Sequence, residues 1–134
     1  MSYQCYSVKD MPDSDEGVIF IGWIRGPVIV GLSKVDKHRL VAVAAVSLDS
    51  NPEFGWPKVK DTNSISCPFY HLPGWIDRKK LNVFEKLLFV FLCARYKLQG
   101  LDSHTAPLFD AMMNGGSFFD ESALQQLEDF CSRL

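Results

Sequence analysis

A long apolar run inside a helix-forming segment is the strongest constraint on this fold. Residues 77–99 hold good helix formers and no internal Gly or Pro, and Gly100 follows as a suitable left-handed C-terminal cap. Within this segment, residues 87–94 are apolar on every side of the expected helix. Because a helix of that kind is normally buried on most sides, we expect residues 77–99 to form the central helix of the core.

The first third of the chain is typical of β structure. Three segments rich in Val, Ile, Phe and Trp, residues 17–24, 27–33 and 39–48, are separated by short breakers. Connections this short favour antiparallel neighbours, so we predict a three-stranded meander, with a possible fourth strand at residues 3–8. The first and third strands do not alternate with polar residues, which predicts that a helix, the long loop or another subunit covers the second face of the sheet.

Two shorter helices are predicted near the C-terminus. One begins at Ala106 or Pro107 and ends before Asn114-Gly115-Gly116, because Pro is favoured in a first helical turn and Gly after a last one. The other begins at Ser117, with Asp120 three residues later approximating a capping box. Its apolar stripe consists of Leu124, Leu127, Phe130, Cys131 and Leu134.

These elements predict one α+β domain over residues 1–134. Its N-terminal antiparallel β meander of three to four strands packs against a C-terminal layer of two to three helices. The chain has 134 residues, of which 47% are hydrophobic, and a chain of this size and composition builds a core without needing a disulfide or a metal.

The two halves are joined by residues 49–76, which hold four prolines and five large aromatic residues. A structureless loop of that length is uncommon in a compact domain, so we expect a short strand at residues 64–70, a functional role, or both. Pro68 would confine such a strand to a sheet edge or a bulge. Aromatic anchors on a rigid loop are typical of interface hot spots, although the same rings could instead cap the core or cover the sheet. Besides Phe54, the aromatic residues are Trp56, Phe69, Tyr70 and Trp75, and these four are the predicted partner-binding residues.

The segment 67–71 offers the most chemistry, because Cys67 and His71 could pair as nucleophile and base. In an extended chain their Cα atoms would lie about 13 Å apart, at about 3.3 Å per residue, too far for a direct hydrogen bond. No acid in the segment orients the His, and no Gly-rich oxyanion turn accompanies it. We therefore predict no catalytic residue, and keep a small-molecule or enzyme pocket near Cys67 and His71 as the alternative.

No metal or cofactor is predicted. The sequence has no CxxC, HxxxH or HExxH spacing, no phosphate-binding Gly-rich loop, and no ordered calcium loop in its acidic residues 10–16. The four cysteines are irregularly spaced, which favours reduced thiols. With no recognisable leader or membrane-spanning run, we expect a cytoplasmic protein that does not enter membranes.

Charge is unevenly distributed along the chain. Residues 25–100 carry 12 basic and six acidic side chains, giving +6, whereas residues 1–24 sum to −3 and residues 101–134 to −5. Either these segments neutralise each other within one domain, or the basic middle contacts an acidic partner. The sequence pI near 5.9 argues against a dedicated nucleic-acid binder.

The function expected from these observations is non-covalent protein–protein contact by a small protein, as an inhibitor, an immunity-type protein or an assembly subunit. Catalysis is less expected than contact. The partner is another protein or a second copy of the chain. A homodimer formed through the apolar strands would dissociate when a strand position such as Ile29 is made charged.

Overall fold

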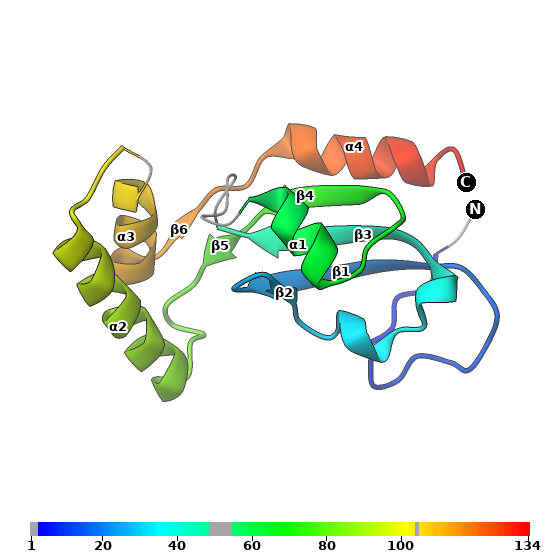
Figure 1. Ribbon diagram of the computed structural model, residues 1–134, viewed down its shortest axis with the longest axis horizontal. Coiled ribbons are helices and arrows are strands. Elements are labelled where there is room, and N and C mark those ends of the chain that lie inside the picture. Colours follow the sequence, from blue (N-terminus) through cyan, green and yellow to red (C-terminus); the bar gives the residue numbers. More distant parts are fainter. Residues whose placement is uncertain (1–2, 49–54, 104) are drawn as a thin grey trace.

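The computed structural model describes residues 3–48, 55–103 and 105–134. Together its helices and strands form an α+β fold, as predicted, with four α-helices among the described residues (Figure 1). The elements in chain order are β1 (Val18–Arg25), β2 (Val28–Ile29), two 3₁₀ helices (Leu32–Lys34 and Lys37–Arg39), β3 (Leu40–Ser47), α1 (Trp56–Thr62), β4 (Phe69–Pro73), β5 (Trp75–Ile76), α2 (Val83–Gln99), α3 (Thr105–Asn114), β6 (Gly116–Ser117) and α4 (Glu121–Cys131).

The main sheet is mixed and mostly parallel, with the strand order β2-β1-β3-β4. Strands β1, β3 and β4 run parallel to one another, and only the two-residue β2 is antiparallel to its neighbour β1. The predicted antiparallel meander is therefore wrong. The helices are also not gathered at the C-terminus, because α1 lies in the chain between β3 and β4.

The meander prediction failed at its second strand. Only Val28–Ile29 pairs with β1, after which Gly31 adopts a left-handed φ of 88° and the chain leaves the sheet. Two 3₁₀ helices follow, and Leu32 in the first and Val35 directly after it are buried in the cluster against the sheet. The two 3₁₀ helices return the chain to the end of the sheet where β1 began, so β3 enters parallel to β1. The predicted strand at residues 3–8 does not form.

The expected strand in the long connection does form, shifted toward the C-terminus. It is β4, Phe69–Pro73, and among the described strands it pairs only with β3, at the sheet edge, where Pro68 and Pro73 are tolerated. The connection also contains α1, so β3, α1 and β4 form a parallel strand–helix–strand unit.

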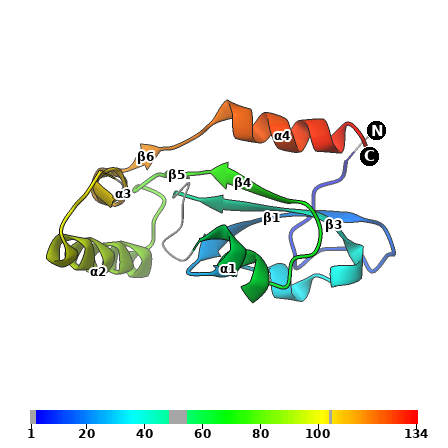
Figure 2. The same ribbon diagram turned by 45° about the horizontal axis from the view of Figure 1, so that its top comes forward.

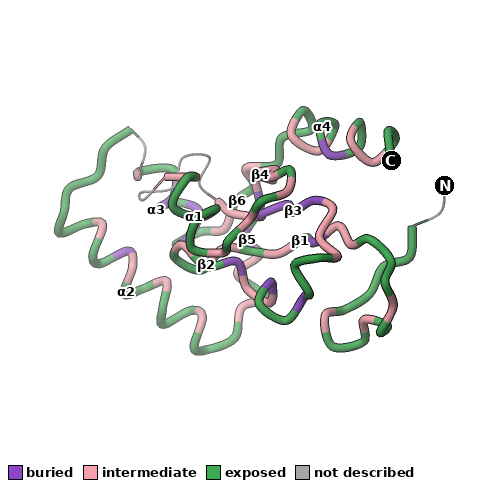
Figure 3. Tube along the Cα trace, turned by 45° about the vertical axis from the view of Figure 1, so that its right-hand side comes forward, coloured by how far each residue is buried: buried purple, intermediate pink, exposed green. Residues whose placement is uncertain are grey.

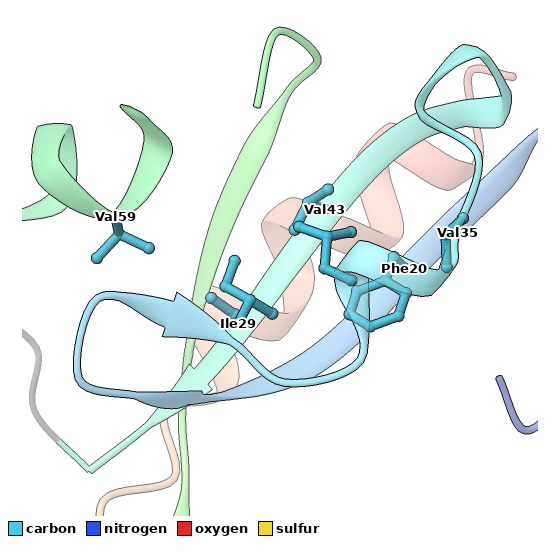
Figure 4. Close-up of a cluster of buried hydrophobic side chains, with 7 residues drawn as sticks. Phe20, Ile29, Val35, Val43 and Val59 are labelled. Atoms are coloured by element: carbon cyan, nitrogen blue, oxygen red, sulfur yellow. The ribbon is translucent and has the colours of Figure 1, made fainter. Parts of the chain in front are cut away.

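The larger core lies between one face of the main sheet and the layer formed by α1 and the 3₁₀ helices. Phe20 of β1, Val43 of β3 and Val59 of α1 all belong to it, and in Figure 4 Ile29 of β2 lies between Val59 and the other two. A Cβ at Gly22 would lie 2.5 Å from a Phe20 ring carbon, so this position needs Gly. We call this cluster the sheet core; its buried members are Phe20, Ile29, Leu32, Val35, Val43, Ala45 and Val59.

The opposite face of the sheet is only partly covered. Helix α4 lies across that face, on the other side from α1 (Figure 2), and packs Phe130 against Tyr70 at a ring distance of 5.7 Å. It begins at Glu121 and not at Ser117, because Asp120 is itself the N-cap and accepts from the Ser122 N–H. On β1, Ile21 and Trp23 point to this same face and stay exposed. The expected cover therefore exists over β3 and β4 and is missing over β1.

The remaining elements form a helical arm beside the sheet, consisting of α2, α3 and the small β5–β6 ladder (Figure 1). Helix α2 begins at Val83, later than predicted, because Asn82 and Glu85 form a reciprocal capping box. It ends before Gly100, as predicted. Helix α3 also forms where it was predicted, and Gly115 follows it with a left-handed φ of 82°.

The arm has a small hydrophobic core of its own. Arg78 fastens the start of the arm by donating from Nη1 to the Met112 carbonyl at 2.8 Å and also to the Met113 carbonyl. The buried residues of this arm core are Ile76, Cys93, Leu108, Ala111 and Met112.

Candidate functional site

The four aromatic residues predicted to bind a partner do not form one surface. Trp56 and Phe69 are partly buried against the sheet core, with their rings 5.7 Å apart. Tyr70 packs against Phe130 on the opposite face. Only Trp75 is largely exposed, at 65%. Their role in partner binding stays a prediction, and Trp75 is the member placed to fulfil it; Phe54 lies outside the described residues.

His71 lies among polar and aromatic groups that the sequence spacing did not indicate. Its Nε2 is 2.9 Å from the Ser47 Oγ, and its ring centroid is 4.5 Å from that of Trp56. Ser47 ends β3, and the parallel pairing of β3 with β4 brings it beside His71. Positions at the carboxyl ends of neighbouring parallel strands could have suggested this pair only if the sheet had been predicted as parallel.

The surroundings of Cys67 disfavour its thiolate form. Cys67 precedes β4 and packs against the sheet core, and burial raises the pKa of its thiol despite the opposing effects of a backbone hydrogen bond and Lys60. A thiol with a raised pKa holds little thiolate at neutral pH, and thiolate is the reactive form. None of the four cysteines forms a disulfide.

An open hollow of about 190 Å³ lies between α4 and the sheet, away from Cys67 and His71. Asp120 is its one charged lining residue, and its carboxylate is already used as the α4 N-cap. The hollow therefore offers apolar contact and little directional polarity. Its lining residues are Val46, Leu72, Pro73, Trp75, Phe119, Asp120 and Leu124.

Among the described residues, α2 has more exposed large apolar side chains than any other element, and here the sequence-based expectation is wrong. This helix was expected to be buried on most sides, but Cys93 is its one buried residue (Figure 3). One side packs on α3 through Phe89, Leu92 and Cys93, while the other side faces solvent. We call that side the α2 apolar face; its exposed large residues are Val83, Phe84, Leu87, Leu88, Val90, Phe91 and Leu98.

The α2 apolar face has the spacing of a helix-pairing seam. Phe84, Leu87, Phe91, Ala94 and Leu98 follow one another at intervals of three, four, three and four residues. This is the a/d heptad spacing, which keeps one stripe of a helix facing a partner helix. This spacing is present in the sequence. It does not stand out there, because the residues that pack on α3 are also apolar and make the helix look apolar on every side.

Lysine and arginine border the seam on both sides. Lys86 and Lys97 are four residues before and seven residues after Val90, so they border one side of the stripe. Arg95 is four residues after Phe91 and borders the other side. All three side chains are exposed. The one acid of α2, Glu85, accepts from the Asn82 N–H at 2.9 Å in the capping box.

Within the described part of the chain, no group of three or more His, Cys, Asp and Glu side chains could hold a metal ion. In the same residues, no helix combines the length and the hydropathy needed to cross a bilayer. Comparison of the chain with protein-family models, curated proteins and solved structures gives no match. The assignment of function therefore depends on the surface chemistry described above.

Proposed function

We propose that this protein acts by non-covalent contact with another protein, and that the α2 apolar face makes the contact. The observation that supports this proposal is the exposure of Phe84, at the start of the apolar stripe, and of Phe91, at its middle, at 70% and 68%. Contiguous exposed apolar patches on soluble domains mark sites of interaction.

The energetic reason is the burial of these side chains on binding. Moving one Phe or Leu from water into an apolar contact contributes roughly 1.5–3 kcal/mol. A partner that covers only part of the α2 apolar face gains several times that amount before the costs of association. The arm supports such contact, because α2 packs on α3 on its opposite side and Arg78, in the segment before α2, donates to a carbonyl of α3.

Site-specific photo-cross-linking tests this function. A photoreactive benzoyl-phenylalanine replaces Phe91 in the full chain, within cells that naturally make the protein, and a matched variant carries it at the exposed position Gln125 on α4. We expect a discrete protein adduct from position 91 and none from position 125. The absence of a protein adduct at position 91, or equal labelling at both positions, would contradict the proposal.

A second candidate, a small-molecule site, is favoured by the 2.9 Å contact between Ser47 and His71. A hydroxyl beside an imidazole, with the Trp56 ring against it, provides polar and stacking contacts for a ligand. A metabolite screen by thermal shift separates this function from the first. A ligand whose stabilising effect survives Cys67→Ala and is lost in His71→Gln would support a site at His71.

A further inference from the structure

We infer that the partner of the α2 apolar face is an acidic amphipathic helix, with an apolar seam of its own and Glu or Asp beside that seam. The inference rests on the proposed function and adds the chemistry of the partner to it. Two features of α2 carry it: the heptad spacing of the exposed apolar residues and the sign of the charges on both sides of them.

The heptad spacing selects a helix as the occupant. A stripe that repeats every 3.5 residues stays aligned with one helical partner over its whole length, whereas a flat or irregular surface does not require this repeat. The stripe extends from Phe84 to Leu98, which at about 1.5 Å per residue is about 21 Å. That length corresponds to two heptads of continuous contact.

The flanking charges select an acidic partner. Lys86 and Lys97 lie on one side of the stripe and Arg95 on the other, so a helix seated on it has cations at both margins. Lys79 and Lys80 add two more exposed cations just before the N-terminus of α2. Carboxylates at the facing positions of the partner would form interhelical ion pairs and would favour this partner over basic ones.

The same charges disfavour a second copy of the chain as the occupant. In a parallel pair of α2 helices, each cation lies near its own equivalent. In an antiparallel pair centred on Phe91, the end with Arg95 and Lys97 approaches Lys86 of the other copy. The one acid of the helix, Glu85, is held in the capping box and is four residues before Phe89 of the arm core, on another side of the helix from the stripe, so it compensates neither arrangement.

The test uses two synthetic helical peptides, each three heptads long, with Leu at the a and d positions. One peptide has Glu and the other Lys at the positions beside the seam. Binding to the full chain is followed by fluorescence anisotropy at low and at moderate salt. We expect the Glu peptide to bind at least about tenfold more tightly, with a preference that weakens as salt screens the charges.

Two matched variants show whether the preference comes from α2. The double variant Arg95→Glu/Lys97→Glu should bind the Lys peptide better than the Glu peptide. The control Lys34→Glu/Lys58→Glu makes the same charge change at exposed positions away from the arm and should keep the wild-type preference. Phe91→Lys should weaken the binding of both peptides.

Several outcomes would overturn the inference that the partner is an acidic helix. The cross-linking experiment tests the proposed function independently of them. Equal binding of both peptides would show that charge does not select the partner. Binding of neither peptide, together with a dimer in light scattering that Phe91→Lys dissociates, would identify a second copy as the occupant. Sedimentation with phosphatidylglycerol vesicles that Phe91→Lys abolishes would identify a lipid surface instead. A monomer that binds no peptide and no vesicle would also refute the inference.

Discussion

Strand β3 and helix α2 both contain a long apolar run, and they are covered to very different extents. Residues 42–45 of β3 are fully buried, with the sheet core on one face and the α4 side on the other. Helix α2 has 17 residues and buries one of them, and among the described elements α3 is the helix that packs most extensively against it. An apolar segment therefore indicates that its side chains need to be buried. It does not show whether other parts of the same chain bury them.

The sharpest way to break this comparison is a matched pair of charged substitutions. Ile29→Lys places an ammonium in the sheet core, where Ile29 is 1% exposed, and should lower the free energy of unfolding by about 4 kcal/mol. Phe91→Lys places the same group on the α2 apolar face and should change the free energy of unfolding by less than about 0.5 kcal/mol. Urea denaturation followed by circular dichroism measures both.

The burial of Ile29 also changes what a charge at this position can test. The sequence-based expectation was that such a charge would dissociate a dimer. Ile29 is inside the molecule, so its replacement tests folding and not association. A large loss of stability in the Phe91→Lys monomer would mean that the α2 apolar face is covered within the chain, and would remove the basis of the proposed function.

The next largest effect should be confined to the arm. Leu108→Ala removes a buried side chain of α3 from the arm core, which should destabilise the arm by about 3 kcal/mol. Because the sheet core has no residue in common with the arm core, we expect amide hydrogen exchange to accelerate in α2 and α3 and to stay unchanged in β3. Equal acceleration in β3 would show that the two cores unfold together.

A smaller effect is expected where α1 is joined to the β1–β2 turn. Asn63 accepts from the Ile29 N–H at 2.9 Å and donates to the Pro27 carbonyl at 2.8 Å and the Val59 carbonyl at 2.7 Å. Asn63→Ala leaves partly buried backbone groups unpaired and should cost about 2 kcal/mol in urea denaturation. The neighbouring exposed substitution Thr62→Ala is the control, and an equal loss in both variants would refute the role of the Asn63 hydrogen bonds.

The elements that sequence predicted well are those with local signals. The ends of α2 and α3 were predicted from Gly100 and Gly115. Both glycines have positive φ angles, which residues with a side chain rarely adopt. The edge position of β4 followed from Pro68, which has no N–H to give to a second neighbour. In each case one residue determines a local backbone outcome.

The elements that were predicted wrongly depend on distant parts of the chain. Whether β1 and β3 run parallel depends on how the residues between them fold back over the sheet. Leu32 in that stretch is buried in a 3₁₀ helix, but in the sequence it looks like part of an apolar strand. The contact of Ser47 with His71 exists only because β3 and β4 are parallel. The candidate site on α2 was missed for the same reason, since its exposure depends on which helices pack beside it.

The smallest expected effect concerns Asp120, the N-cap of α4. A hydrogen bond from the Ser122 hydroxyl, and a second from the Ser122 N–H, hold the pKa of its carboxyl below its ordinary range. A lowered pKa in the folded state means that the charged cap stabilises the fold above the ordinary Asp value of about 3.9. That stabilisation is lost as the pH falls through the lower folded value.

Comparison of the wild type with Asp120→Asn should therefore show a small stability difference that is constant above about pH 5 and shrinks below about pH 3.9. Asn keeps the capping geometry, so the variant removes the charge and leaves the cap in place. Thermal denaturation at pH 6 and at pH 3 provides the measurement. If the stability difference between the wild type and Asp120→Asn is as large at pH 3 as at pH 6, the ionised carboxylate of Asp120 is not its cause. The cover that α4 provides over β3 and β4 would then not depend on the charge of its N-cap.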